Sequence, residues 1–199
     1  MTNTGGNRKL EPEDLYTLER YARERSGFRA RVIEHKKIRQ VAIGSNVTVQ
    51  FEDRLTMQYQ VQEMLRIERI FEPEGIAEEL GTYNALVPDG SNWKATFMIE
   101  YPDVEERRVA LERLKGIERH VWVRVAGYHR VYAIADEDIE RENETKTSSV
   151  HFLRFELTPE MAARVKHGES VEIGIDHAAY DVTVRIPDAV RDSLAADLS

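Results

Sequence analysis

Residues 41–51 read VAIGSNVTVQF, a pattern typical of a β-hairpin. Apolar and polar residues alternate on both sides of a Gly44-Ser45-Asn46 turn. Asp53 follows and can cap a helix, because apolar residues between Leu55 and Phe71 continue at helical spacing. Strand and helix periods therefore meet within one short segment, which predicts a mixed fold.

Helical spacing dominates the chain around this hairpin. The sequence EPED at residues 11–14 predicts a helix start, and residues 12–38 are expected to be helical, with Ser26-Gly27 dividing or bending that segment. Another helix is expected at residues 73–86, and the sequence PDGSN at residues 88–92 predicts a turn. The N-terminal part is therefore predicted to be mainly helical.

The second half is rich in strand patterns. Further helices are expected at residues 104–117, 158–166 and 187–196, and a polar loop or exposed helical turn at 137–147. Strands are expected at residues 94–101, 120–126, 130–135, 148–157 and 170–175. The predicted fold class is α+β: a helical N-terminal part packed with a largely antiparallel β-sheet in the C-terminal half.

The length of 199 residues suits one domain. Residues 1–9 are small, polar and contain glycine, so they are expected to be a disordered lead-in. Residues 10–199 then form a single α+β domain. Within it, residues 10–88 would make a helical sub-lobe and residues 89–199 a sheet-rich one.

Composition excludes several kinds of site. The chain contains no cysteine, which excludes disulfides, a thiolate nucleophile, a cysteine-ligated zinc site and an iron–sulfur cluster held by its own thiolates. The motifs Gly-x-Ser-x-Gly, P-loop and GxGxxG are also missing from the sequence. The first ten residues, MTNTGGNRKL, lack the apolar region of a signal peptide, and no window is long and apolar enough for a membrane span. The cytoplasm is therefore the expected location.

The charge balance argues against nucleic acid as a partner. Lys and Arg number 28 against 36 Asp and Glu, so the net charge is 28 − 36 = −8. Nucleic-acid affinity depends largely on cations that neutralise phosphates. A local basic cluster is nevertheless present, and it is interpreted as a solvated helix face. Its members are Arg29, Arg31, Lys36, Lys37 and Arg39.

A polar stripe follows the helix after Asp53. Arg54, Gln58, Gln62 and Arg66 are spaced four residues apart, and Glu63 lies beside them. Amide and guanidinium groups on one face suit recognition of a carboxylate, a phosphate or the backbone of a partner. The alternative is a solvated helix face with local ion pairs.

Two histidines suggest a metal site as an alternative. His151 and His177 are in phase with apolar strand positions, so both are expected to point toward the apolar face. Together with carboxylates such as Glu63 and Glu156, they could bind Fe, Mn or Zn. However, no two histidines show the spacing of a metal motif, and buried histidines with satisfied hydrogen bonds are the simpler interpretation.

Several strings together resemble a bacterial family, the domain of unknown function DUF3501, over about residues 10–184. The strings are RLTMQYQVQEMLRIER (54–69), LVPDGSNWKAT (86–96), VYAIADED (131–138), SVHFLRFEL (149–157) and GIDH (174–177). The resemblance implies no activity and transfers no catalytic residue. Genes of this family lie beside those of a rubrerythrin-like protein and an iron–sulfur oxidoreductase subunit, which implies a redox or peroxide-stress setting.

These observations predict a non-catalytic accessory or binding protein without a cofactor, acting through a polar surface around Gln58, Gln62, Glu63 and Arg66. The resemblance implies rubrerythrin-like and iron–sulfur oxidoreductase partners. A homo-oligomer is also expected, because the N-terminal helices are more apolar than one buried face requires. The alternative is a metal-dependent enzyme that uses the histidines and carboxylates named above.

Overall fold

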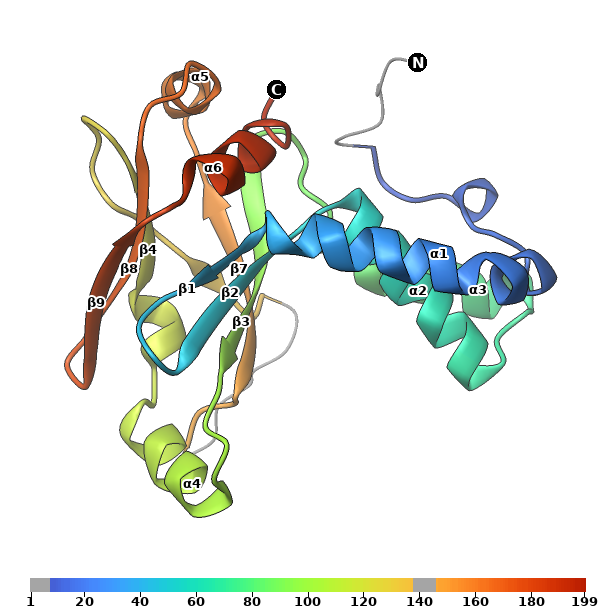
Figure 1. Cartoon of the computed structure of the whole chain (residues 1–199), viewed down its shortest axis with the longest axis horizontal. Coiled ribbons are helices and arrows are strands. Elements are labelled where there is room, and N and C mark those ends of the chain that lie inside the picture. The colour runs from blue at the N-terminus through green and yellow to red at the C-terminus, as the bar shows by residue number, and fades with distance from the viewer. Residues whose placement is uncertain (1–7, 138–145) are drawn as a thin grey trace.

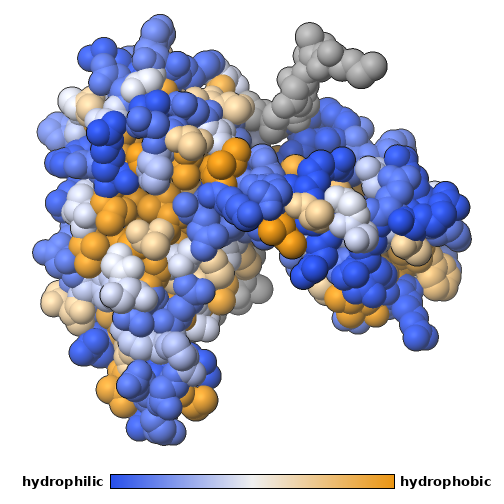
Figure 2. Space-filling model, in the orientation of Figure 1, coloured by the Kyte–Doolittle hydropathy of each residue, from blue (hydrophilic) through white to orange (hydrophobic). Residues whose placement is uncertain are grey.

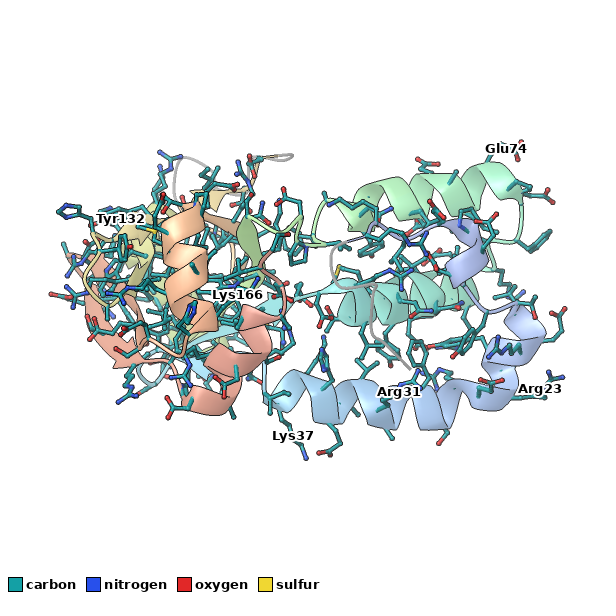
Figure 3. All side chains as sticks on the ribbon, turned by 90° about the horizontal axis from the view of Figure 1, so that it is seen from above. Arg23, Arg31, Lys37, Glu74, Tyr132 and Lys166 are labelled. Atoms are coloured by element: carbon teal, nitrogen blue, oxygen red, sulfur yellow. The ribbon has the colours of Figure 1, made fainter. Side chains whose placement is uncertain are left out.

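The computed structural model describes residues 8–137 and 146–199, and it separates a helical lobe from a β-sandwich lobe (Figure 1). In the helical lobe, α2 packs between α1 and α3, which lie on its opposite sides when seen from above (Figure 3). The elements of the helical lobe are the 3-10 turn η1 (Pro12–Asp14) and the helices α1 (Leu18–Lys37), α2 (Arg54–Glu68) and α3 (Pro73–Asn84).

The sandwich lobe consists of two antiparallel sheets. One has the strand order β1-β2-β3-β7-β6 and the other the order β5-β4-β8-β9. The strands are β1 (Gln40–Ala42), β2 (Val47–Glu52), β3 (Asn92–Ile99), β4 (Val121–Val125), β5 (Val131–Tyr132), β6 (Ile134–Ala135), β7 (Val150–Glu156), β8 (Val171–His177) and β9 (Tyr180–Arg185). The remaining helical elements are α4 (Val104–Arg113), η2 (Ile117–His120), α5 (Pro159–Lys166) and α6 (Asp188–Ala195).

The main hydrophobic core lies in the sandwich lobe, and two smaller clusters stabilise the helical lobe. Trp93 of β3 and Leu194 of α6 are fully buried in the main core, and the Trp93 indole donates a hydrogen bond of 3.0 Å to the Leu194 carbonyl. Apolar surface remains visible on the sandwich below α6 and beside β1, whereas the visible face of α1 is mostly hydrophilic (Figure 2). Helix α6 is therefore fixed to the sandwich by its apolar side.

The hairpin predicted from residues 41–51 is present as β1 and β2. Its turn needs Gly44, which has a φ of +71°; a Cβ at this position would lie 2.6 Å from the hydroxyl oxygen of Tyr180. That hydroxyl donates to the carbonyl of Ile43 at 2.6 Å and accepts from the amide of Asn46 at 3.2 Å. The hairpin turn therefore connects the edges of the two sheets, since Tyr180 belongs to β9.

The predicted cap of α2 is confirmed. Asp53 Oδ1 accepts from the amide of Thr56, and Thr56 Oγ1 accepts from the amide of Asp53, both at 2.9 Å. This capping box satisfies two amides at the point where the strand period changes to the helical period. At the other end, Arg69 adopts a left-handed conformation and terminates the helix.

Three sequence predictions need correction. Helix α1 begins at Leu18 rather than near Pro12, because Thr17 caps it after the separate turn η1. It is also continuous through Ser26-Gly27, since Phe28 and Val32 anchor the following turns in a buried cluster. The strand expected at 130–135 is two short strands in different sheets, β5 and β6.

Strand β9 was not predicted, and it completes the second sheet beside β8. Its position depends on pairing with β8, which a short local pattern cannot reveal. Most of the predicted polar loop at 137–147 and residues 1–7 of the predicted lead-in lie outside the described residues. Within the described part, Lys9 donates to the carbonyls of Asn84 and Val87, both at 2.7 Å.

In the described part of the chain, none of the helices combines the length and apolar character needed to cross a bilayer. The chain end near residue 198 is attached to the start of the sheet-rich half, because Leu198 forms a parallel bridge with Gly90 and the amide of Ser199 donates to the Gly90 carbonyl at 2.8 Å. This attachment places the segment after α6 close to the junction between the two lobes.

Gly174→Ala is expected to lower the free energy of unfolding by about 1–3 kcal/mol, because overpacking forces neighbours to move. A Cβ on Gly174 would lie 2.4 Å from Trp122 Cζ2 and 2.9 Å from the carbonyl oxygen of Val182. Gly81→Ala in α3 is the matched control, because no atom lies within 4 Å of its added Cβ. The control should gain about 0.5–1 kcal/mol from helix propensity. Urea unfolding measures both, and equal effects would contradict the packing of Trp122 on Gly174.

Candidate functional site

A cleft of about 660 Å³ lies between the helical lobe and the sandwich lobe. Its walls come from the end of α1, the first turns of α2 and helix α6, which lies beside the end of α1 that carries Lys37 (Figure 3). Cavities of about 300–1,000 Å³ commonly hold small molecules and often occur between lobes. The charged and polar residues that line it are His35, Arg39, Asp53, Arg54, Gln58, Asp192, Ser193 and Asp197, and we call the buried Arg39, Asp53 and Asp197, with His35 and Ser193, its base.

Arg39, predicted above to lie on a solvated helix face, follows α1 at the junction of the two lobes and is only 1% exposed. Its Nε donates to the Phe51 carbonyl at 3.2 Å, and its Nη2 donates to the Glu52 carbonyl at 3.1 Å and to Asp197 Oδ2 at 2.5 Å. Its Nη1 donates to the carbonyl and the hydroxyl of Ser193, at 3.2 and 3.1 Å. The guanidinium therefore connects the end of β2 to α6 and the segment that follows α6.

His35 and Asp53 form a hydrogen-bonded pair beside Arg39. His35 Nε2 lies 2.5 Å from Asp53 Oδ2, and Arg39 Nε lies 3.4 Å from the same oxygen. Since the other oxygen of Asp53 caps α2, both of its oxygens are used within the chain. No described residue forms a hydrogen bond with His35 Nδ1, and the His35 side chain is 25% exposed in the cleft wall.

The two carboxylates around Arg39 have pKa values that shift in opposite directions. Burial raises the pKa of Asp197 to about 6, even though the Arg39 guanidinium opposes this shift. Burial also acts to raise the pKa of Asp53, but the hydrogen bond with His35, the charge of Arg39 and the amide of Thr56 hold it below its usual value. Opposite shifts of neighbouring titratable groups in a cleft are typical of functional sites.

Part of the predicted polar stripe lines this cleft. Arg54 and Gln58 are in the cleft wall, and both bind the N-terminal segment. Arg54 Nη2 lies 2.5 Å from Asp14 Oδ2, and its Nε donates to the Arg8 carbonyl at 3.1 Å. Gln58 Nε2 donates to the Asp14 carbonyl at 2.6 Å. The stripe therefore positions the chain's own turn η1 beside the cleft.

The rest of the stripe lies away from the cleft, against α1 and the segment before it. Gln62 is fully buried, and its amide exchanges hydrogen bonds with the backbone of Tyr16. Glu63 accepts from the Arg25 guanidinium through both oxygens at 2.7 Å and from the Tyr21 hydroxyl at 2.6 Å. Arg66 Nη2 also donates to Glu63, at 3.2 Å. The polar groups of this surface bind other parts of the same chain. Recognition of a partner through the surface stays a prediction.

Glu63 is held in its charged form. The hydrogen bonds from Arg25, with those from Tyr21 and Arg66, lower the pKa of Glu63 to about 2 although burial opposes them. The carboxylate in turn raises the pKa of Tyr21, adding to the effect of burial. Glu63 therefore attaches α1 to α2 by charge-assisted hydrogen bonds.

The structure does not bring the four proposed metal ligands together. His151 is fully buried in β7, as its strand phase predicted, and its Nδ1 lies 2.5 Å from Asp136 Oδ2 while its Nε2 lies 2.8 Å from Thr147 Oγ1. Glu156 lies five residues further along β7, about 17 Å away at the usual rise of a strand. Glu63 belongs to α2 in the helical lobe.

His177, at the end of β8, uses both ring nitrogens within the chain. Its Nε2 donates to the Lys115 carbonyl and its Nδ1 accepts from the Ala179 amide, both at 3.2 Å. Residues 8–137 and 146–199 contain no group of three or more His, Asp or Glu side chains arranged to hold a metal ion. The metal-dependent alternative therefore stays a prediction without a shared set of ligands in the described residues.

Sequence reasoning did not identify the cleft. One signal was available: His35 is in helical phase with Phe28 and Val32, which are buried, so the histidine had to face inward. Nothing in the sequence paired Arg39 with Ser193 and Asp197, which lie 154 and 158 positions later. This contact depends on how α6 folds back across the end of β2.

Comparisons with known proteins match most of the chain. The family model DUF3501, described as a protein of unknown function, matches residues 9–198. The chain is also similar to a crystal structure of a novel protein of unknown function from Burkholderia pseudomallei K96243. The two share 52% sequence identity with a TM-score of 0.92, over 96% of this chain and 100% of the other. A comparison with curated proteins finds no match.

Glu63→Gln is expected to lower the free energy of unfolding at pH 7 by about 1–3 kcal/mol, because it weakens charge-assisted hydrogen bonds. The folded pKa of about 2 lies below the ordinary 4.5, so the wild-type advantage is present above pH 4.5 and is lost as the pH falls toward 2. Urea unfolding between pH 7 and pH 2 measures the difference. Glu78→Gln, on the exposed part of α3, is the control and should show no such pH dependence. A gap that stays constant down to pH 2 would contradict the prediction.

Asp197→Asn is expected to change the pH dependence of the free energy of unfolding in the direction opposite to that of Glu63→Gln. The folded pKa of about 6 lies above the ordinary 3.8, so Asp197 reduces wild-type stability as the pH rises from about 4 to 6. The variant should therefore gain on the wild type by roughly 2–3 kcal/mol over this interval, since one pKa unit corresponds to about 1.4 kcal/mol. Asp192→Asn, which alters an exposed carboxylate of α6, is the control. Parallel curves for wild type and Asp197→Asn would contradict the shift.

Proposed function

Because this chain belongs to the DUF3501 family of proteins of unknown function, we propose its function from the cleft: it is a non-catalytic binding protein that holds a small molecule between its two lobes. One observation carries the proposal. The His35–Asp53 pair and the buried Arg39–Asp197 pair meet at the base of a cleft of about 660 Å³. A concave site with a few convergent polar groups and shifted pKa values is the expected form of a ligand site.

The contacts around the cleft support binding by a preformed wall. Arg39, Ser193 and Asp197 hold one another through hydrogen bonds of 2.5–3.2 Å. Asp53 is held at the same time by the α2 cap and by His35. A site whose polar groups are already fixed loses little conformational entropy when a ligand binds. The lobes therefore present these groups in one arrangement.

The wider role is part of the same proposal. The family resemblance favours an accessory function in a redox or peroxide-stress setting, with rubrerythrin-like and iron–sulfur oxidoreductase proteins as partners. These partners, a cytoplasmic location and a homo-oligomeric state stay predictions. In this scheme the chain would bind a small molecule for its partners and would hold no redox centre of its own.

The proposal can be tested by filling the cleft. Ala189 of α6 lines it, so Ala189→Trp should occupy the cleft with an indole ring. A library of small organic fragments is screened by saturation-transfer NMR against the wild type, and the fragments that bind are measured again on two variants. We expect at least a tenfold loss of affinity on Ala189→Trp. The matched control is Ala163→Trp on the exposed side of α5, which should bind like the wild type. Fragments that bind all three proteins equally, or no fragment binding at all, would contradict the proposal.

A further inference from the structure

The hydrogen-bond donors of Arg39 at the base of the cleft are already used by the chain. All five N–H groups of Arg39 have partners: two backbone carbonyls at the end of β2, the carbonyl and hydroxyl of Ser193, and Asp197. Arg54 is paired with Asp14, and the side-chain amide of Gln58 donates to the Asp14 carbonyl. A carboxylate or a phosphate would have to displace these contacts in order to bind Arg39.

His35 offers a hydrogen-bond acceptor to a ligand, its Nδ1 atom. The Asp53 carboxylate accepts from His35 Nε2 at 2.5 Å, so Nε2 carries the hydrogen in the neutral ring and Nδ1 has a lone pair. No described residue donates to this Nδ1, although His35 lines the cleft. The base of the cleft therefore offers an imidazole acceptor next to a carboxylate.

The charge at the base favours a cation. Two carboxylates, Asp53 and Asp197, contact the single guanidinium of Arg39, at 3.4 and 2.5 Å. The other arginine of the cleft, Arg54, has its own counter-charge in Asp14. When both aspartates are ionised and the His35 ring is neutral, the charges of Asp53, Asp197 and Arg39 at the base of the cleft sum to −1.

Apolar side chains also line the cleft. Ile38, Leu55, Ala189 and Ala196 line the cleft, and Ile38 is 43% exposed there. Burial of such surface by an apolar group contributes about 25 cal/mol per Å². The walls therefore suit the hydrocarbon part of a ligand whose polar end reaches the base.

We propose that the cleft binds an organic ammonium ion with an apolar body, one of its N–H groups donating to His35 Nδ1 and its charge balancing the excess negative charge of the aspartates at the base. This inference rests on the proposed function and names the ligand class of the same site. Amines of this kind combine the donors, the positive charge and the hydrocarbon surface that the cleft complements.

Three probes with the same ring test the ligand class: benzylammonium, benzyl alcohol and benzoate carry a cationic, a neutral and an anionic group. Each is titrated into the full chain, and the methyl NMR signals of Ile38 and Leu55 report binding in the cleft. We expect benzylammonium to move these signals and to bind at least tenfold more tightly than benzoate. Benzyl alcohol, which can donate one hydrogen bond but has no charge, should lie between them.

Two variants test the residues. His35→Gln keeps an N–H donor for Asp53 but removes the Nδ1 acceptor, and Asp53→Asn keeps a helix-capping side chain but removes the charge. Each should weaken benzylammonium binding about tenfold. Asp188→Asn is the matched control, because Asp188 is an exposed residue of α6 outside the cleft, and it should bind like the wild type.

The outcomes separate the ligand class from the existence of the site. Benzoate binding as tight as that of benzylammonium would overturn the ammonium assignment and leave the cleft a binding site. Methyl signals that none of the probes moves would also overturn it, and the fragment screen with Ala189→Trp then decides whether the cleft binds any small molecule. Unchanged affinity in both His35→Gln and Asp53→Asn would exclude the proposed contact with His35 and the proposed effect of the Asp53 charge.

Discussion

The guanidinium of Arg39 lies where the end of α1, the end of β2 and helix α6 meet, and its side chain is only 1% exposed. A buried positive charge is costly unless it is paired and fully hydrogen-bonded. Here the partners are two backbone carbonyls at the end of β2 and the side chains of Ser193 and Asp197, which lie far along the sequence. Arg39 therefore holds α6 against the end of the hairpin, and the cleft depends on this contact because α6 forms one of its walls.

The sequence predicted well what local geometry determines. The hairpin at residues 41–51 and the cap at Asp53 were predicted because a turn, an alternating pattern and a capping residue are all encoded within a few positions. Strand β9 and the division of residues 130–135 between two sheets were missed, since both depend on pairing between distant segments. The cleft was missed for the same reason: its charged base combines residues that are 158 positions apart. The one local indication of the cleft was the helical phase of His35, which predicted that this side chain faces inward but did not identify its partner.

The polar stripe of α2 shows a distinction that a sequence pattern cannot make. Periodicity placed Arg54, Gln58 and Gln62 on one helix face, and their chemistry suggested recognition of a carboxylate, a phosphate or the backbone of a partner. The backbone that they bind belongs to the chain's own segment around Asp14 and Tyr16. A helix amide that binds a partner and one that binds its own chain give the same sequence pattern, so only the fold distinguishes them. The stripe thereby supports one wall of the cleft.

The distance along the chain between Arg39 and Asp197 also matters during biosynthesis. A ribosome adds about 5–20 residues per second, and domains begin to fold as they emerge. The helical lobe can form its own contacts early, because all of its elements lie before residue 85. The 158 positions that separate Asp197 from Arg39 correspond to roughly 8–30 seconds of translation at these rates. During that time the nascent chain has an arginine at the junction without its final counter-charge, so the packing of α6 against the end of β2 is a late event in its production.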